Sequence, residues 1–285
     1  MRFTCLVFSL FLVSCSSIKT KPLGAHVSQR PNVLMICLDD LNDWVGCLKG
    51  HPQAYTPNID KLAAKGTLFT NAHCQAPRCN PSRISVLSGL NPTKTGIYDN
   101  RYYWAAALPN LETLPRYFKK QGYRVEGGGK IFHHNPGQNP RGQWHYYFKQ
   151  QYDDPYHRYP AGSVNSLPLK PKAEVRWPEG FPLNNLSNVK NAVRPPYNPR
   201  EFDWGPLDRT IYETGDGKTV AWAEQFLDVE HEDPFFLAVG IFRPHLPWYA
   251  PKEFFDRFPV EDIILPKIKE NDLDDVPEEG KKIAM

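Results

Sequence analysis

Uninterrupted apolar runs that end in polar residues mark the strands expected at the centre of this chain. Residues 31–38 read Pro-Asn-Val-Leu-Met-Ile-Cys-Leu without alternation and lead into Asp39 and Asp40, and residues 234–241 form a second such run. Continuous apolar runs are typical of parallel strands that are buried on both faces. The pattern therefore predicts two central strands of a parallel sheet.

Helix signals alternate with these strands. Four segments combine an apolar face or a helix-start residue with a suitable end, namely residues 57–65, 81–88, 110–121 and 217–229. Gly66, Gly89 and Gly122 stand where three of these helices should stop. Shorter strands are expected at residues 67–70 and 123–125. Alternating strands and helices predict an α/β fold, with a mostly parallel central sheet and helices on both faces.

Composition narrows the class of protein. With 285 residues, 41% of them hydrophobic, the chain is long enough for a large core. The net charge of +3 is dispersed along the sequence, which argues against a nucleic-acid partner. Residues 135–212 are rich in Pro, Asn, Tyr and Arg and show little periodicity. We expect an irregular insertion there, either a specificity region or an elaboration of the scaffold.

The first residues predict export from the cytoplasm. Residues 1–15 contain one positive charge and then an apolar run too short to span a bilayer, as in a signal peptide. The run ends in Leu-Val-Ser-Cys, which resembles a bacterial lipobox and implies lipidation of Cys15. We expect residues 16–30 to form a tether to the membrane, with the protein in the periplasm or at the cell surface. An ordinary signal peptide with an incidental Cys15 is the alternative.

Cys79 stands at the mouth of a predicted helix. Pro81 suits the first helical turn and Gly89 suits the exit. The free amides and the positive dipole end of this helix would face Cys79 and any bound anion. This arrangement indicates a nucleophile in an anion-binding site, and an unmodified structural thiol is the alternative.

Further polar residues follow the predicted strands. Asp39 and Asp40 lie at the carboxyl end of the first strand, where open α/β sheets bind ligands, and a pair of carboxylates suits Ca²⁺. A solvated strand end is the alternative. Residues 127–133 read Gly-Gly-Gly-Lys-Ile-Phe-His, in which the glycines would let the backbone approach an anion beside Lys130 and His133.

His245 follows the second apolar strand in the run Arg-Pro-His-Leu-Pro. A histidine between prolines is often structural. The end of its strand, however, should share one sheet edge with Asp39 and Lys130, because the carboxyl ends of parallel strands lie together. This shared edge favours a functional role for His245 over a purely structural one.

The motif at residues 79–83, Cys-Asn-Pro-Ser-Arg, resembles the signature of the sulfatases. The segment at 127–133 and the turn around His245 are similar to those of the iduronate-2-sulfatase group, within the alkaline-phosphatase-like superfamily. Leu90 departs from the family pattern, which usually has Lys or Arg there. The resemblance runs in order from residue 31 to about residue 258.

The resemblance implies a chemistry for Cys79 and for the two carboxylates. In sulfatases a maturase converts the cysteine to formylglycine, and the hydrate of this aldehyde attacks the sulfur of a sulfate ester. The acidic pair holds Ca²⁺, so Asp39, Asp40 and residue 79 are the implied metal ligands. The implied function is hydrolysis of sulfuric esters, with a sulfated oligosaccharide as the substrate.

The resemblance also implies roles for the other charged residues. Arg83 and Lys130 would stabilise the developing charge, His245 would assist departure of the alcohol, and His133 would release sulfate from the enzyme. His134, which adjoins His133, is expected to be a bystander.

Members of this family are much longer, and later segments complete their calcium site. We therefore expect residues 31–285 to be the N-terminal portion of a sulfatase catalytic domain. Two other functions stay open. One is a sulfated-glycan-binding lipoprotein that lacks turnover, and the other is a phosphatase or phosphonate hydrolase of the same superfamily.

Overall fold

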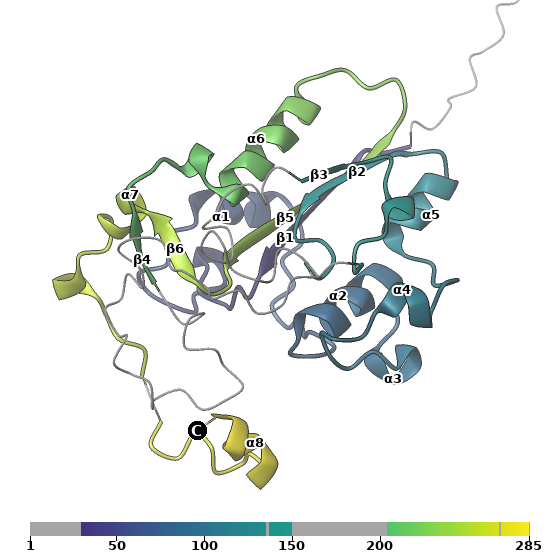
Figure 1. Ribbon diagram of the computed structural model, residues 1–285. Coiled ribbons are helices and arrows are strands. Elements are labelled where there is room, and N and C mark those ends of the chain that lie inside the picture. The colour runs from purple at the N-terminus through teal and green to yellow at the C-terminus, as the bar shows by residue number, and fades with distance from the viewer. Residues whose placement is uncertain (1–29, 135–136, 150–203, 268, 285) are drawn as a thin grey trace, which may run out of the picture. The chain divides into compact units, whose positions relative to one another are not determined.

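A four-stranded parallel sheet lies at the centre of the computed structural model, which describes residues 30–134, 137–149, 204–267 and 269–284. Its strands are β1 (Val33–Asp39), β5 (Phe235–Pro244), β2 (Arg124–Gly129) and β3 (Tyr146–Phe148), in that spatial order (Figure 1). Every neighbouring pair is parallel. The predicted signal peptide with its lipobox, and the tether up to residue 29, lie outside the described residues.

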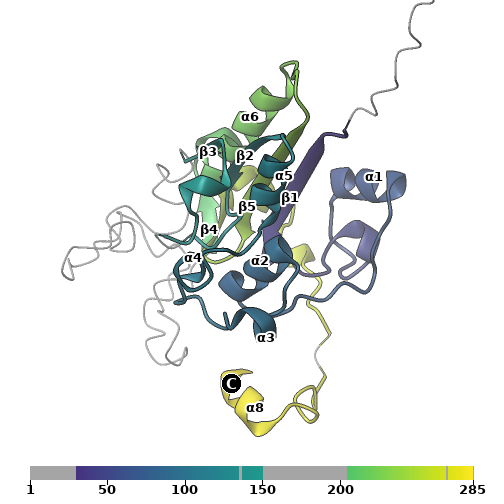
Figure 2. The ribbon, with the colours of Figure 1, turned by 90° about the vertical axis from the view of Figure 1, so that its right-hand side faces the viewer.

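Helices cover both faces of the sheet (Figure 2). The helices are α1 (Pro57–Lys65), α2 (Cys79–Ser88), α3 (Pro92–Thr95), α4 (Trp104–Ala107), α5 (Leu114–Lys120), α6 (Gly215–Leu227), α7 (Lys252–Phe255) and α8 (Glu278–Ala284). Short 3-10 turns occur at Gly46–Leu48, Arg141–Gln143, Ile211–Glu213 and Val260–Asp262. A separate parallel pair joins β4 (Trp204–Leu207) to β6 (Trp248–Pro251). The predicted fold class is confirmed.

Alternate residues of β5 build two hydrophobic clusters. Phe236 and Ala238 pack in one cluster with side chains of α2, α4 and α5, including Trp104. Phe235, Leu237 and Val239 pack in the other with Ala223 of α6 and its neighbours. This alternation is the two-residue period of a strand whose faces are both buried. Among the described residues no helix is both long and apolar enough to cross a membrane.

β1 differs from the prediction of a strand that is buried on both faces. Leu34, Ile36 and Leu38 are 45%, 53% and 40% exposed. β1 lies at the edge of the described sheet, and the cluster beneath α6 draws on β5. Within the described residues, the outer face of β1 is therefore only partly covered, although the continuous apolar run predicted its position.

Several predicted elements need correction at their ends. α2 begins at Cys79 instead of Pro81, and α5 begins at Leu114 because Thr113 is still extended. No strand forms at 67–70, where Leu68 and Phe69 are exposed and have no strand partner among the described residues.

The range 135–212 is also less irregular than expected. Most of it lies outside the described residues, but β3 belongs to the central sheet and β4 forms the small parallel pair. Tyr146 and Tyr147 pair with Glu126 and Gly127 of β2. A strand this short carries too few residues for its two-residue period to stand out in the sequence.

Candidate active site

A buried carboxylate between two cations is the centre of the site. Asp39 is the last residue of β1, and its carboxylate accepts hydrogen bonds from Arg83 Nη2 at 2.5 Å and from Lys130 Nζ. Lys130 directly follows β2, and Arg83 comes from the first turns of α2. Arg83 Nη1 also donates to the carbonyl oxygens of Lys130 and Ile131. Three elements thus converge at the carboxyl edge of the sheet, as predicted for open α/β folds.

The electrostatics of this cluster favour an anion. Burial opposes ionisation of Asp39, but Lys130 and Arg83 outweigh burial, so the pKa of this carboxyl lies below its usual range. Burial lowers the pKa of Lys130. Two cations face a single buried carboxylate, and Arg83 Nε is buried without a hydrogen-bond partner among the described residues. The Nε–H of Arg83 could donate to a bound anion, although Asp40 adds a second negative charge beside this cluster.

Cys79 is the first residue of α2, and its Sγ lies 3.7 Å from Lys130 Nζ. Burial raises the pKa of the Cys79 thiol, and the attraction of Lys130 does not offset this effect. The unmodified thiol is therefore protonated near neutral pH, so it is a poor nucleophile as it stands. A nucleophilic role at this position would need a modification of the side chain, a neighbouring base or a bound metal ion that lowers the thiol pKa.

His245 lies beside the same cluster. Its Nε2 is 3.7 Å from Asp40 Oδ2, and single ligand atoms of Asp39, Cys79 and His245 all lie within 4.8 Å of one another. Burial and the nearby Lys130 lower the pKa of His245, which is thus neutral at neutral pH. Asp40 adopts a left-handed conformation with φ of 58°, which aspartate tolerates better than most residues, and this turns the chain directly after β1.

The sequence analysis did not single out Phe242, whose ring contacts Lys130 and two histidines. Its buried ring lies 4.5 Å from Lys130 Nζ and 4.8 Å from the ring of His245. The ring of His134 is 6.2 Å from Phe242 and 4.1 Å from that of His133. The structure therefore places His133 on the loop beside the site and puts His134 between His133 and Phe242. Phe242 was inconspicuous because it simply continues the apolar run of β5.

Asp216 is a second residue that the sequence analysis missed. Its two carboxylate oxygens accept hydrogen bonds from the backbone amides of Phe242 at 2.8 Å and Arg243 at 2.9 Å. Asp216 lies in the first turn of α6, where a negative charge is favourable. The start of α6 thus holds the end of β5 that leads to His245. The sequence did contain a signal for the start of this helix, because Thr214, two residues before Asp216, caps α6.

The glycines of residues 127–129 were expected to let the backbone approach an anion, but the structure gives them a packing role. A Cβ at Gly127 or Gly128 would lie 2.8 Å from the ring of Trp144 or Trp222. Gly129 has φ of 73°, and a Cβ there would lie 1.8 Å from the carbonyl oxygen of Gly240. The glycines therefore admit large rings and a neighbouring strand, and Lys130 contributes the positive charge.

The donor set suits a hard cation only in part. Ca²⁺ takes about six to eight oxygen ligands. The described residues bring ligand atoms of Asp39, Cys79 and His245 within 4.8 Å of one another, and Asp40 Oδ2 lies 3.7 Å from His245 Nε2. Both Asp39 oxygens already accept from cationic groups. The chemistry of the two carboxylates fits Ca²⁺, while the number of ligands from the described residues does not complete its shell.

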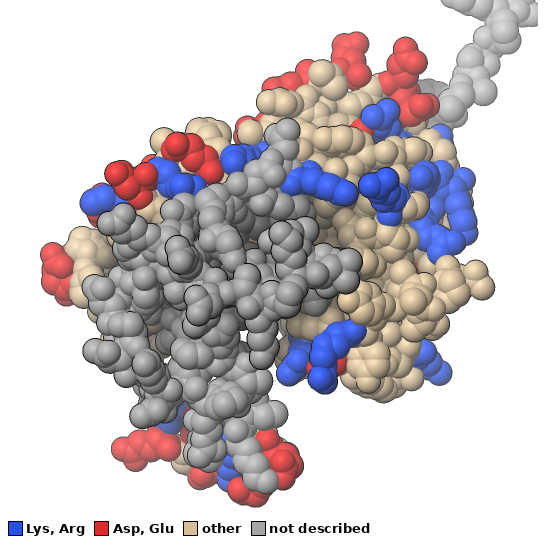
Figure 3. Space-filling view, in the orientation of Figure 1, with Lys and Arg blue, Asp and Glu red and all other residues tan. Residues whose placement is uncertain are grey.

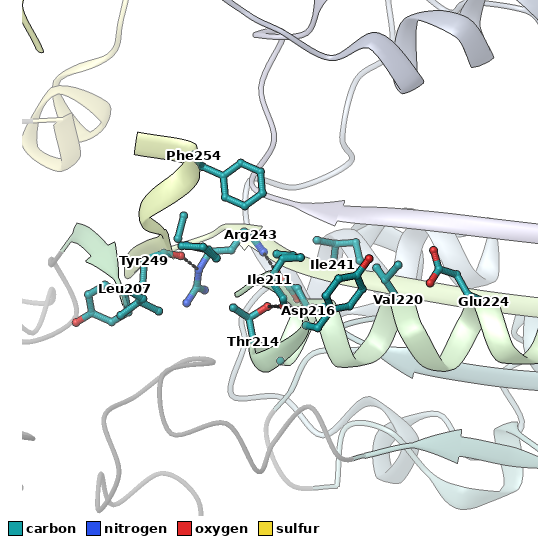
Figure 4. A pocket seen from close by; sticks show the side chains of 15 residues that line it. Leu207, Ile211, Thr214, Asp216, Val220, Glu224, Ile241, Arg243, Tyr249 and Phe254 are labelled. Atoms are coloured by element: carbon teal, nitrogen blue, oxygen red, sulfur yellow. Dashed lines mark hydrogen bonds between the residues drawn. The ribbon is translucent and has the colours of Figure 1, made fainter. Parts of the chain in front are cut away.

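A cavity of about 430 Å³ lies elsewhere, against α6, β4 and β6 (Figure 4). Its lining is mainly apolar and includes Leu207, Ile211, Val220 and Tyr249. Asp39, Cys79 and Lys130 do not line it. The cluster around Asp39 and this cavity are therefore separate features.

The ion pairs of Asp39 predict a loss of stability in acid. The folded-state pKa of Asp39 lies below its unfolded value of about 3.9, so the ionised group stabilises the fold above that pH. This contribution disappears as the pH falls through the folded-state pKa. We expect the unfolding free energy of Asp39→Asn to depend less on pH below about pH 4 than that of the wild type. Urea unfolding at a series of pH values measures this.

Asp256→Asn is the matched control, because Asp256 is a half-exposed carboxylate paired with Lys252 at the surface. If the two variants show the same acid dependence, the buried ion pairs of Asp39 are not its source.

A parallel sheet whose carboxyl edge gathers a cysteine, two cations and a carboxylate defines a hydrolase-like α/β site for anionic groups. Residues 31–266 match the family model described as Sulfatase, and the chain belongs to the sulfatase family. It is 34% identical to a sulfatase of Formosa agariphila, across 98% of this chain and 51% of that protein. It is 33% identical to human iduronate 2-sulfatase, across 88% of this chain and 42% of that protein.

Solved structures support the fold. A phosphonate monoester hydrolase of Agrobacterium radiobacter superposes with a TM-score of 0.54 at 18% identity and covers 83% of this chain and 45% of its own. A protein solved with its substrate D-glucosamine-2-N,6-O-disulfate gives 0.54 at 16% identity, over 84% of this chain and 39% of its own. The chain spans about half the length of the curated relatives given above.

Proposed function

We propose that this chain carries the nucleophile-bearing part of a sulfatase active site and acts on sulfated saccharides. The observation that carries this proposal is the position of Cys79, which lies in the sulfatase motif at the start of α2 with its Sγ 3.7 Å from Lys130 Nζ. Sulfatases among its relatives, including iduronate 2-sulfatase, support the ester class. Sulfated glucosamine, the substrate in one solved neighbour, supports a sulfated sugar.

The nucleophile would come from modification of Cys79. Conversion to formylglycine supplies a hydrated aldehyde, whose hydroxyl can attack sulfur where the protonated thiol of the unmodified residue is a poor nucleophile. The positive charges of Lys130 and Arg83 would hold the sulfate oxygens and stabilise the negative charge that develops on them. Because both cations are already fixed by Asp39, little reorganisation is needed when the ester binds.

His245 would give its proton to the departing alcohol oxygen. The unliganded site favours neutral His245, but a bound anion adjacent to the imidazole raises its pKa and favours protonation. Asp40, 3.7 Å from Nε2, would also stabilise the charged imidazole. His133 would act later as the base that releases sulfate from residue 79.

A calcium ion held by Asp39, Asp40 and residue 79 would neutralise charge on the sulfate group. We expect the 285-residue chain alone to bind Ca²⁺ weakly, with a Kd of about 10⁻³ M or higher, because the described ligands form only part of a shell. Titration calorimetry measures the binding, and a chromogenic sulfate ester measures turnover, which we expect to be low. Tight binding together with rapid turnover would show that this chain already provides a complete site.

The protonated thiol of unmodified Cys79 favours a second candidate, a protein that binds sulfated glycans without turning them over. The two candidates differ at residue 79. Formylglycine in this position together with sulfate release supports the hydrolase, whereas a retained thiol together with glycan binding supports the binding protein. Release of phosphate or phosphonate, with sulfate esters untouched, would instead indicate another activity of the superfamily.

We also propose that the protein is exported and anchored through a lipid on Cys15. One acyl chain binds a membrane only marginally, so stable retention needs the several chains that lipobox processing attaches. We expect the wild type in the membrane fraction and Cys15→Ala in the soluble fraction after cell lysis. Recovery of both proteins in the soluble periplasmic fraction would leave Cys15 without an anchoring role.

A further inference from the structure

A short loop that joins α3 to α4 is fastened to the start of the nucleophile helix. This loop, Tyr98–Tyr103, is called the rim below. Asn80, the residue after Cys79, is buried, and its Nδ2 donates to the carbonyl oxygens of Asp99 at 3.1 Å and Tyr102 at 2.9 Å. The backbone amide of Asn80 donates to Asn100 Oδ1 at 2.9 Å. The rim therefore keeps a fixed position beside residue 79.

The rim also forms part of a group of charged side chains that includes Arg78. Asp99 accepts from Arg78 at 3.1 Å and from Arg101 at 3.0 Å, so two guanidinium groups share one carboxylate. Their side chains are 53% and 89% exposed. Exposed ion pairs of this kind contribute little to stability and are easily exchanged for another anion. One positive charge remains unbalanced within this group, next to Cys79 in sequence.

Aromatic rings accompany these charges. Tyr98, Tyr102 and Tyr103 each expose half or more of their surface, although most large aromatic side chains of the central sheet are buried. A tyrosine ring offers an apolar face for the carbon-bound hydrogens of a sugar and a hydroxyl for its polar groups. A guanidinium group binds sulfate or carboxylate oxygens through two parallel hydrogen bonds. Together they suit an anionic sugar chain.

We propose that the rim binds sugar units adjacent to the one whose sulfate ester lies at residue 79. The inference rests on the proposed function for its orientation toward residue 79. The ligand class is a sulfated oligosaccharide of several units, whose neighbouring sulfate groups bind Arg101 and Arg78 while its rings stack on Tyr102 and Tyr103.

Other basic residues provide a test of specificity. Figure 3 shows groups of basic side chains over α5 and near α2 and α3. Arg124 of β2 resembles Arg101, because its guanidinium is exposed and paired with the carboxylate of Glu126. Tyr117 of α5 matches Tyr103 in exposure. Arg124→Ala and Tyr117→Ala are therefore matched controls for Arg101→Ala and Tyr103→Ala.

The experiment measures binding of a heparin hexasaccharide, and of its desulfated form, to the 285-residue chain by calorimetry at fixed salt. We expect Arg101→Ala and Tyr103→Ala each to weaken binding of the sulfated form by about tenfold, on the scale of a lost charged hydrogen bond or a lost ring contact. The control variants should stay within about twofold of the wild type, because neither side chain belongs to the rim and salt screens the exposed charge of Arg124. The desulfated form should bind more weakly than the sulfated one. Thermal unfolding checks that each variant is folded.

The outcomes separate this inference from the proposed function. Equal losses in the rim and control variants, or no binding by the wild type, would overturn the role of the rim. Rim-dependent binding by a chain whose Cys79 is never converted would support the rim while the proposed hydrolase fails. If Cys79 is converted and sulfate is released, but the rim variants do not change hexasaccharide binding, the hydrolase proposal is supported and sugar binding by the rim is rejected.

Discussion

Conversion of Cys79 to formylglycine is the first expected result when the chain is produced together with a formylglycine-generating maturase. The peptide from Cys79 to Arg83, released by trypsin, should lose sulfur and two hydrogens and gain one oxygen. Cys79 is expected to change because it begins the intact Cys-x-Pro-Ser-Arg pattern. Cys74, five residues earlier and exposed, is outside the pattern and should keep its thiol.

The effect of this residue on turnover should be the largest in the protein. In catalytically competent protein, Cys79→Ala should lower the rate of sulfate ester hydrolysis by at least about 10³-fold, because removal of a nucleophile leaves only binding and electrostatic effects. Cys74→Ala is the control and should retain the wild-type rate. An unmodified Cys79, under conditions in which a known sulfatase is converted, would reject the hydrolase proposal.

Lys130→Ala and His245→Ala should give the next largest losses of turnover. Removal of a buried electrostatic group costs about 10²- to 10³-fold, and removal of a general acid about 10²- to 10⁴-fold. Lys130 lies against Cys79 and Asp39, and His245 shares the cluster of ligand atoms with both. Initial rates with a chromogenic sulfate ester measure both losses.

His134→Ala is the matched control for His245→Ala. The ring of His134 lies 6.2 Å from Phe242, whereas that of His245 lies 4.8 Å from it, and His245 belongs to the cluster of ligand atoms with Asp39 and Cys79. We expect His134→Ala to change turnover by less than about fivefold, since it only repacks the neighbourhood of Phe242. Equal losses for all three variants would mean that the roles of the loop after β2 have been assigned to the wrong residues.

Local sequence signals were sufficient for most of the main elements of the fold. Pro81 and Gly89 indicated the helix that carries Cys79, and the structure places its end at Ser88 with Gly89 in the left-handed conformation. Apolar runs located β1 and β5, because buried strands need apolar residues on both faces. Asp39 ends one of these runs and His245 follows the other. Because parallel strands present their carboxyl ends at one edge of the sheet, both residues were expected at that edge.

Only the tertiary structure decided how these residues pair. Arg83 and Lys130 lie 44 and 91 residues from Asp39 in the sequence, and no local pattern indicates that both would bind its carboxylate. The hydrogen bonds from Phe242 and Arg243 to Asp216 are also non-local, since they join residues 26 and 27 positions apart. Sequence periodicity reports which face of an element is apolar, but it does not report which charged group lies opposite.

The tertiary structure also decided which apolar residues are buried. The apolar run of β1 has the composition of a central strand, yet β1 lies at the edge of the described sheet and exposes Leu34, Ile36 and Leu38. The glycines before Lys130 have the composition of an anion-binding loop, yet they accommodate Trp144, Trp222 and the neighbouring strand. The sequence by itself determined the elements and the reactive groups, because these depend on residues close together in the chain. Strand order and side-chain packing decided exposure and pairing, because these depend on residues that only folding brings into contact.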